Sequence, residues 1–318
     1  MEFPISLRLA VEAGAAAVPP GKLQKAAEGL TARYKTQSGQ GKRLVTDKTD
    51  VLAYAAVRMP ATFGAVSQAL VWIKQLFPEP VRSVLDVGAG TGAGIWAADA
   101  VFDTLEEAVC LEREENMLAL GKSLMQDADL PLSVRWIPGD MRDKLPDGKY
   151  DLVLAAYALN ELTPSDRAAV LGALWAKTGK LLVLVEPGTP AAFSQLRTAR
   201  EALLSLDAHI LAPCPHGEAC PMPEDDWCHF TCRVARSRLH KQLKGGDAPF
   251  EDEKFAYLAF SREAFPPAEA RVLRHPRIDA GRIGLTLCAC SGIEARTVTK
   301  KDKDAFKKAR KADCGDMF

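Results

Sequence analysis

The sequence predicts an α/β protein with a mostly parallel sheet, an N-terminal helical region and a cysteine-rich C-terminal extension. Short apolar runs alternate with helical patterns between residues 81 and 210, which is typical of a parallel sheet covered on both faces. Cysteine and proline are concentrated in residues 213–232, so this segment cannot be a helix or strand along its whole length. We therefore divide the chain into a helical region (1–80), a sheet domain (81–210) and a cysteine-rich, basic region (211–318).

Hydrophobic spacing places the individual elements. Apolar side chains between Phe63 and Phe77 recur on one helical face, which ends at Pro78. The expected strands are Ser83–Val87, Ala108–Leu111, Ser133–Ile137, Leu152–Ala156 and Leu181–Val185. The expected helices of the sheet domain are Gly92–Val101, Glu114–Gln126, Ser165–Ala176 and Ala191–Leu206. The remainder is expected to combine a basic helix, short strands and a charged C-terminal helix.

Composition narrows the class of protein. The 318 residues include 41 basic and 41 acidic side chains, and 47% are hydrophobic, which is typical of a globular chain and not of a disordered one. No run reaches the roughly 18–20 apolar residues that span a membrane, and the N-terminus resembles neither a signal peptide nor a transit peptide. We therefore expect a cytoplasmic monomer with no membrane partner. In that reducing compartment the eight cysteines are expected to be free thiols or metal ligands.

The most informative short segment runs from Val84 to Gly94. An apolar strand ends in Asp86, and a glycine-rich turn then opens a helix. Glycines let the backbone approach a ligand, and a helix N-terminus offers free N–H groups to a carboxylate or phosphate. Dinucleotide-binding folds share such a turn, so the turn alone does not identify the ligand.

Three acids favour S-adenosylmethionine and, with it, the class I methyltransferase (Rossmann-like) fold. Asp86 precedes the turn, where a carboxylate can meet the ammonium group of the ligand's methionine part. Glu112 ends the second strand, where two oxygens can accept both ribose hydroxyls, and Asp140 follows the third strand, near the adenine amino group. The predicted binding set is Asp86, Gly88, Ala89, Gly90, Gly92, Glu112 and Asp140. The alternative is a tight structural turn with surface acids.

The segment after the fourth strand gives only weak catalytic candidates. It lacks both the Asn/Asp-Pro-Pro-aromatic loop common in methyl transfer to nitrogen and the cysteine nucleophile needed for methylation of pyrimidine carbon 5. Asn160 and Glu161 are polar and follow this strand, so they are candidates for a chemical role. The alternative is that they only line the pocket.

Four cysteines occur within a short stretch, at intervals of 6, 8 and 4 residues: Cys214, Cys220, Cys228 and Cys232. The first two intervals are wider than the ligand spacing of ordinary zinc modules. Three such cysteines and a distant fourth suit a cubane iron–sulfur cluster, and zinc is the alternative. Cys232, Cys288 and Cys290 compete for the fourth position, and His216 and His229 can replace a thiol.

Two clusters of basic side chains occur in the C-terminal region, one after the cysteine-rich stretch and one near the end of the sequence. One set comprises Arg233, Arg236, Arg238, Lys241 and Lys244, and the other lies within Lys300–Lys311. Clustered Lys and Arg are typical of surfaces that contact nucleic-acid phosphates. The alternative is a pair of solvated helix faces.

The chain resembles the methyltransferase-like small-subunit ribosome assembly proteins of bacteria and mitochondria. The matching segments cover most of the chain and include Ala53–Thr62, Leu85–Gly94, Glu186–Pro190, Ala212–His216, Trp227–Phe230 and Glu251–Leu258. The cysteine-rich and Glu-Asp-Glu-Lys motifs are more specific than the glycine loop. A departure is Cys314, which stands where the family commonly has tryptophan.

The resemblance implies a partner and a metal site. The partner is the small ribosomal subunit, with its rRNA and ribosomal proteins, and the implied cofactors are S-adenosylmethionine and a 4Fe–4S cluster. Carried over by position, the cluster ligands are Cys214, Cys220, Cys228 and Cys288. The implied function is that of a cofactor-binding factor acting during subunit assembly and translation. The alternative is an active rRNA methyltransferase, and the predicted fold favours an enzyme.

Overall fold

The structure, a computed structural model, describes residues 2–37, 45 and 47–318. The N-terminal region contains helices α1 (Ile5–Ala16), α2 (Pro20–Gln37), α3 (Lys48–Val57) and α4 (Met59–Lys74). Asp47 begins α3, because its Oδ1 accepts the N–H groups of Thr49 and Asp50 at 2.7 and 2.9 Å. α4 is buried along most of its length and packs against the sheet domain.

The sheet domain is built on five parallel strands. These are β1 (Ser83–Val87), β2 (Glu107–Glu112), β3 (Ser133–Pro138), β4 (Tyr150–Ala156) and β5 (Thr178–Pro187), and they confirm the predicted strands within a few residues at each end. The sheet continues with β8 (Phe250–Ser261) antiparallel to β5, and β8 pairs in turn with β6 (His209–Ala212) and β7 (Phe230–Ala235). The strand order β3-β2-β1-β4-β5-β8-β6 is that of the class I methyltransferase fold.

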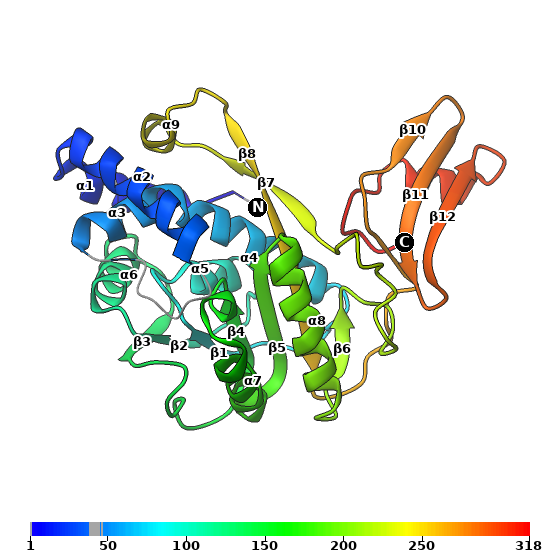
Figure 1. Cartoon of the computed structure of the whole chain (residues 1–318), viewed down its shortest axis with the longest axis horizontal. Coiled ribbons are helices and arrows are strands. Elements are labelled where there is room, and N and C mark those ends of the chain that lie inside the picture. The colour runs from blue at the N-terminus through cyan, green and yellow to red at the C-terminus, as the bar shows by residue number, and fades with distance from the viewer. Residues whose placement is uncertain (1, 38–44, 46) are drawn as a thin grey trace.

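Helices cover both faces of this sheet (Figure 1). They are α5 (Ala93–Val101), α6 (Glu115–Asp127), α7 (Pro164–Lys177) and α8 (Pro190–Leu204), close to the predicted ranges. Because successive strand residues point to opposite faces, Val84 packs with α4 and α5, whereas Leu85 packs with α7 and α8. None of the helices in the described part of the chain is long and apolar enough to cross a membrane.

The C-terminal region forms a second sheet of β9 (Ala270–Val272), β10 (Arg277–Asp279), β11 (Arg282–Ala289) and β12 (Gly292–Thr299). Helix α10 (Lys303–Ala309) and the terminal Phe318 close its core. The predicted basic helix is α9 (Arg238–Lys244), which joins β7 to β8. Figure 1 shows the second sheet standing apart from α7 on the far side of β6, with the cysteine-rich loop between the two sheets.

Candidate functional site

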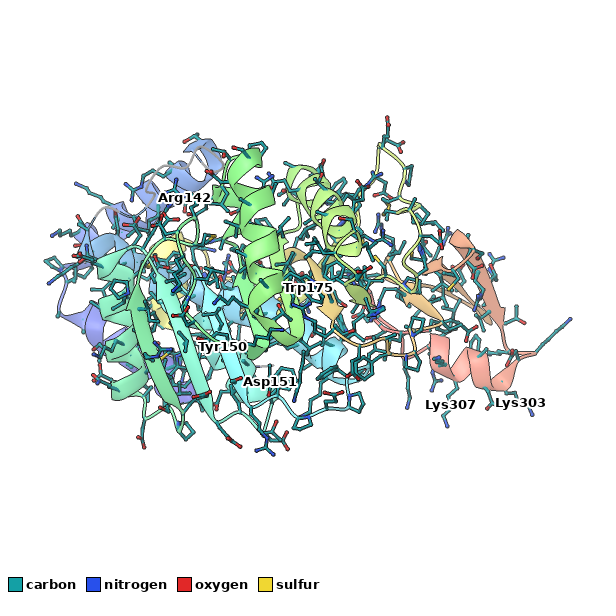
Figure 2. All side chains as sticks on the ribbon, turned by 90° about the horizontal axis from the view of Figure 1, so that it is seen from below. Arg142, Tyr150, Asp151, Trp175, Lys303 and Lys307 are labelled. Atoms are coloured by element: carbon teal, nitrogen blue, oxygen red, sulfur yellow. The ribbon has the colours of Figure 1, made fainter. Side chains whose placement is uncertain are left out.

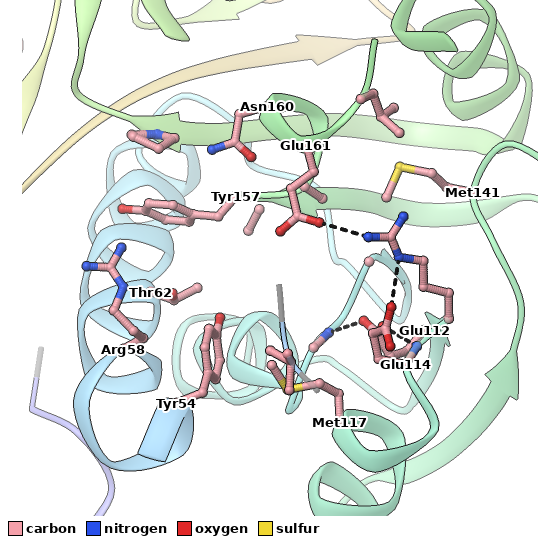
Figure 3. A pocket seen from close by; sticks show the side chains of 18 of the residues that line it. Tyr54, Arg58, Thr62, Glu112, Glu114, Met117, Met141, Tyr157, Asn160 and Glu161 are labelled. Carbon is pink, nitrogen blue, oxygen red and sulfur yellow. Dashed lines mark hydrogen bonds and ion pairs between the residues drawn. The ribbon is translucent and has the colours of Figure 1, made fainter. Parts of the chain in front are cut away.

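A cavity of about 560 Å³ opens at the carboxyl ends of β1, β2 and β4 (Figure 3). Open parallel sheets bind ligands at this edge, because the loops that follow the strands meet there. In Figure 3, Tyr54, Arg58 and Tyr157 lie along one side of the cavity, and Glu112 and Glu114 along the other. Residues predicted to bind the cofactor and residues predicted for catalysis line it together: Gly88, Gly90, Glu112, Asp140, Asn160 and Glu161.

Three glycines of the loop after β1 have a positive φ, and at two of them a side chain would also clash with its neighbours. Gly88 has φ 72° and Gly92 has φ 85°, a region that side chains disfavour. A Cβ on Gly88 would also lie 2.8 Å from the Cβ of Ala158, which is too close. Gly88 and Gly90 line the cavity, whereas Ala89 and Gly92 are not among the lining residues. Gly92 instead caps the N-terminus of α5.

Glu112 ends β2 and faces the glycine loop. Its Oε2 accepts the N–H of Gly90 at 2.7 Å, and its Oε1 accepts the N–H of Glu114 at 2.7 Å. Burial raises the pKa of Glu112, and the two backbone N–H groups oppose that rise. Because each carboxylate oxygen can accept more than one hydrogen bond, Glu112 keeps the capacity to accept further donors from the cavity.

Asp86 lies behind the loop and is not among the residues that line the cavity. It is buried, and its Oδ2 lies 2.6 Å from the point that a Cβ on Gly94 would occupy, so only glycine at position 94 admits the carboxylate. Burial raises the pKa of Asp86 to about 7, and the negative charge of Glu112 adds to the rise. The expected contact between Asp86 and a ligand's ammonium group stays a prediction.

Asp140 lines the cavity after β3, but arginines already hold its carboxylate. Arg142 donates from Nε to Oδ1 at 2.9 Å and from Nη2 to Oδ2 at 2.6 Å, and these hydrogen bonds lower the pKa of Asp140. Arg113 lies 3.8 Å from the same carboxylate and 3.3 Å from that of Glu161. One guanidinium therefore links the segments that follow β3 and β4.

The backbone turns sharply where β4 ends. Tyr157 has φ 57°, which is unusual for a residue other than glycine and marks local strain. Its hydroxyl donates to Oε1 of Glu253 on β8 at 2.8 Å. The turn that follows brings Asn160 and Glu161 to the cavity, and burial raises the pKa of Glu161 to about 7.

Glu186 was not among the site residues predicted from the sequence, and it lies one residue before the end of β5, beside the cavity-lining Pro187. Glu186 is buried, and its Oε1 accepts the N–H of Leu159 at 2.9 Å. Its Oε2 has no hydrogen-bond partner in the described part of the chain, and burial raises its pKa to about 8. Glu186 could have been found from the sequence, because it is an acid near the end of an apolar strand, as Asp86 and Glu112 are.

A second, smaller cavity lies between α8, β8 and the C-terminal sheet. The cysteines that line it are Cys214, Cys220, Cys228 and Cys288. Burial raises the pKa of Cys214, and it raises that of Cys228 further and that of Cys288 to about 12. Among the described residues, no group of three or more Cys, His, Asp or Glu side chains is arranged to hold a metal ion. A metal-binding role for this region therefore stays a proposal.

The remaining thiols lie elsewhere. Cys232 is buried against α4, with its Sγ 3.3 Å from the point that a Cβ on Gly64 would occupy. Cys290 is exposed, and Cys314 is buried near the C-terminus. The other candidate ligands are not among the residues that line the second cavity: Cys232, Cys290, His216 and His229.

Acids of β8 hold part of the basic segment expected to contact RNA. Arg233 pairs with Asp252 at 3.0 Å, and Glu251 pairs with Arg236 at 3.0 Å and with Lys244 at 2.8 Å. The partners of these three basic side chains in the structure are therefore carboxylates. These pairs weaken the positive field that the segment offers to phosphates.

The C-terminal basic stretch presents its charge at the surface. Figure 2 shows Lys303 and Lys307 on α10 at the far end of the molecule, and both are exposed. Lys308, on the same helix, lies with its Nζ 5.1 Å from the ring centre of Phe318. The phosphate contacts predicted for residues 300–311 are thus best tested at Lys303 and Lys307.

Comparison with solved structures finds methyltransferases at low identity. Magnesium protoporphyrin IX methyltransferase from Synechocystis, solved with bound S-adenosylmethionine, is 15% identical, with a TM-score of 0.43 over 73% of this chain and 91% of the other. The plantazolicin methyltransferase BpumL, in complex with S-adenosylhomocysteine, is 11% identical, with a TM-score of 0.43 over 77% of this chain and 98% of the other.

Comparison with characterised proteins finds mitochondrial relatives. The human ribosome assembly protein METTL17, mitochondrial, is 31% identical over 84% of this chain and 62% of its own length. The Rsm22-cox11 tandem protein 2, mitochondrial, of Schizosaccharomyces pombe is 26% identical over 91% of this chain and 45% of its own length. The chain thus spans about half to three fifths of these relatives.

These names overturn the cytoplasmic location expected from the sequence, because both relatives are mitochondrial. That expectation depended on the lack of a recognisable targeting signal, which is a weak argument about location. The model of the family described as mitochondrial small ribosomal subunit Rsm22 matches residues 48–318. The chain therefore belongs to the Rsm22 family of the mitochondrial small ribosomal subunit.

Proposed function

We propose that this protein is an assembly factor of the small ribosomal subunit that binds S-adenosylmethionine in the 560 Å³ cavity. The observation that supports the cofactor most is that residues from three separate strand ends line one cavity, namely Gly88, Gly90, Glu112 and Asp140. Family membership and the human relative's name, a ribosome assembly protein, support the role in assembly. The proposed partners are the rRNA and proteins of that subunit.

The residues of the cavity fit this cofactor by their chemistry. Gly88 and Gly90 expose backbone to the cavity, and Glu112 offers carboxylate oxygens at the site proposed for the ribose. Arg142 donates to both carboxylate oxygens of Asp140, so Asp140 would accept the adenine amino group through their remaining lone pairs. When bound, S-adenosylmethionine carries an activated methyl group.

We also propose a 4Fe–4S cluster held by Cys214, Cys220, Cys228 and Cys288. Four thiols on one cavity are the donor set that a cubane requires. Zinc bound by four cysteines is the alternative, and within the described residues the thiols are not arranged around a single ion. Binding would tie the loop of residues 213–232 to β11, so part of the binding free energy would stabilise the fold there.

An active rRNA methyltransferase is the second candidate. It is supported by Asn160 and Glu161, which line the same cavity as the proposed cofactor residues. A carboxyl group with a pKa of about 7, such as Glu161, can exchange a proton near neutral pH and so act as a general base.

A labelling experiment separates these two functions. Maturing small subunits are incubated with the protein and S-adenosylmethionine labelled in its methyl group. We expect the label to stay with the protein and to be released unchanged on denaturation. Label covalently attached to rRNA, and absent with the Glu161→Gln variant but not with a variant at the exposed Glu115, establishes the enzyme instead. Calorimetry that detects no binding of the cofactor overturns the proposed cofactor site.

A further inference from the structure

Two arginines are buried beside the cysteine cavity and line it. Arg271 of β9 is 1% exposed and Arg200 of α8 is 3% exposed. A buried guanidinium is costly unless an anion or several acceptors surround it. Within the described part of the chain their side chains hydrogen-bond to backbone carbonyls and form no ion pair with a carboxylate. Backbone carbonyls therefore accept hydrogen bonds from both arginines, but no carboxylate among the described residues offsets their charge.

Each arginine anchors the surrounding chain and keeps one donor unused. Arg271 donates from Nε to the carbonyl of Pro213 at 3.1 Å and from Nη1 to that of Gly315 at 2.8 Å, and its Nη2 has no partner among the described residues. Arg200 donates from Nη2 to two carbonyls of the cysteine loop, and its Nε has no partner there either. The anchoring bonds fix both side chains at the cavity wall.

Tyr257 adds a neutral donor to the same wall. It lies on β8, is 2% exposed and lines the cysteine cavity. Its hydroxyl is buried with no hydrogen-bond partner among the described residues. Buried polar groups without partners are uncommon in folded proteins, so three around a single cavity call for an occupant that accepts hydrogen bonds.

We propose that Arg200, Arg271 and Tyr257 are positioning residues that receive an anionic iron–sulfur cluster. This inference rests on the proposed cluster and adds to it the groups that offset its charge. Four thiolates outweigh the positive charge of the cubane, so the loaded site is anionic, and two guanidinium groups compensate it. Unused N–H and O–H groups also match the sulfurs of a cluster, which accept hydrogen bonds and tune its reduction potential.

The charge of these residues predicts the direction of their effect. Reduction adds an electron to the cluster, so nearby positive charge and hydrogen-bond donors stabilise the reduced form more than the oxidised form. Removing any of the three groups should therefore shift the midpoint potential to more negative values. A purely structural role as loop anchors predicts a loss of folding stability with no shift in potential.

The test compares Tyr257→Phe, Arg271→Lys and Arg271→Gln with wild type after anaerobic purification. The control is Arg282→Gln, which removes the same charge from β11 at a side chain that is 65% exposed. Iron, sulfide and thermal unfolding are measured first, and the midpoint potential is then taken from a redox titration followed by electron paramagnetic resonance. Tyr257→Phe deletes only an unpartnered hydroxyl, so we expect it to fold normally.

We expect Tyr257→Phe and Arg271→Gln that retain the cluster to have a more negative midpoint potential than wild type, and Arg271→Lys, which keeps the positive charge, to lie between Arg271→Gln and wild type. We expect Arg271→Gln to shift furthest or to lose iron and sulfide fastest to a chelator, and Arg282→Gln to match wild type. Cluster-loaded Tyr257→Phe with the potential of wild type, and likewise Arg271→Gln where it retains the cluster, would overturn the inference and leave the cluster itself standing. Wild-type protein without iron or sulfide overturns the cluster, and this inference with it.

Discussion

Glu112 accepts the backbone N–H of Gly90 at 2.7 Å, which ties the end of β2 to the loop that follows β1. The carboxylate proposed to receive a ribose is therefore also the group that holds the glycine loop in place. Burial raises the pKa of Glu112, and the two N–H groups that it accepts favour its ionised form. A change at this residue is expected to affect the loop and the ligand together.

We expect Glu112→Ala to weaken binding of S-adenosylmethionine about ten- to a hundred-fold, the cost of one hydrogen bond to a charged group. Calorimetry measures the affinity, and thermal unfolding measures the separate effect on the loop. The control is Glu115→Ala, which removes an exposed acid from the first turn of α6. Unchanged affinity in Glu112→Ala would contradict the assignment of this residue.

The buried Glu186 predicts how stability depends on pH. Its pKa rises from an ordinary value of 4.5 to about 8 on folding, so the folded state keeps a proton that the unfolded state loses. The protonated carboxyl contributes stability below about pH 4.5, and this contribution is lost progressively as the pH rises to about 8. Glu186→Gln should therefore gain stability relative to wild type across this window, by on the order of a few kcal/mol.

Urea unfolding at several pH values measures that difference. The gain should grow from about pH 5 to about pH 8 and then level off, because both states of the wild type are ionised above that range. Glu115→Gln is the control, since an exposed carboxyl should show no such trend. A stability difference that is constant with pH would show that Glu186 is ionised in the folded protein.

The cysteine assignment predicts different results for two buried thiols. Cys288→Ser should abolish binding of iron and sulfide, because Cys288 lines the cavity. Cys232→Ser should retain both, because Cys232 packs against Gly64 on α4 instead. Elemental analysis and an absorbance spectrum of anaerobic protein provide the measurement. Retention in the first variant with loss in the second would mean that Cys232 is the fourth ligand, and stoichiometric zinc without sulfide would reject the cluster.

The ion pairs of β8 predict which basic side chains reach RNA. The double variant Lys303→Gln/Lys307→Gln should weaken RNA binding and reduce the slope of log affinity against log salt by roughly 0.7–0.9 for each phosphate that the protein no longer neutralises. Arg236→Gln should leave that slope unchanged, because Arg236 is paired with Glu251. Filter binding over a range of salt concentrations tests both. An altered slope in Arg236→Gln alone would show that RNA binds near α9 and not at α10.

The parallel strands were predictable because each is a short apolar run that ends at a turn or helix signal. β8 was not predictable, because three acids follow Phe250 at its start, namely Glu251, Asp252 and Glu253. The strand is buried only from Phe255 onwards. Its burial depends on β5 and β6, which are distant in sequence, and on β7, which precedes it across α9. Local patterns do not carry that information.

For the candidate site, the sequence predicted which residues lie at strand ends but not which way their side chains point. Strand-end position brought Glu112 and Asp140 to the cavity as expected, but it could not tell that Asp86 would lie behind the loop or that Arg142 would hold Asp140. Spacing alone left Cys232 and Cys288 as rivals, since only the fold brings β11 beside the cysteine loop. These distinctions depend on side-chain direction and tertiary neighbours, which spacing along the chain does not carry.

Helix α8 separates the two cavities and contributes to both. Ala191, Ala192 and Gln195 face the larger one, whereas Phe193, Leu196 and Arg200 face the cysteines. Trp227, next to Cys228, also donates from Nε1 to the carbonyl of Gly188, just before this helix, at 2.9 Å. If either proposed ligand displaces α8, binding in the two cavities is thermodynamically linked. Such linkage is reciprocal: the factor by which the proposed nucleoside cofactor changes the affinity of the cysteine cavity for its metal centre equals the factor by which the metal centre changes the affinity for the nucleoside.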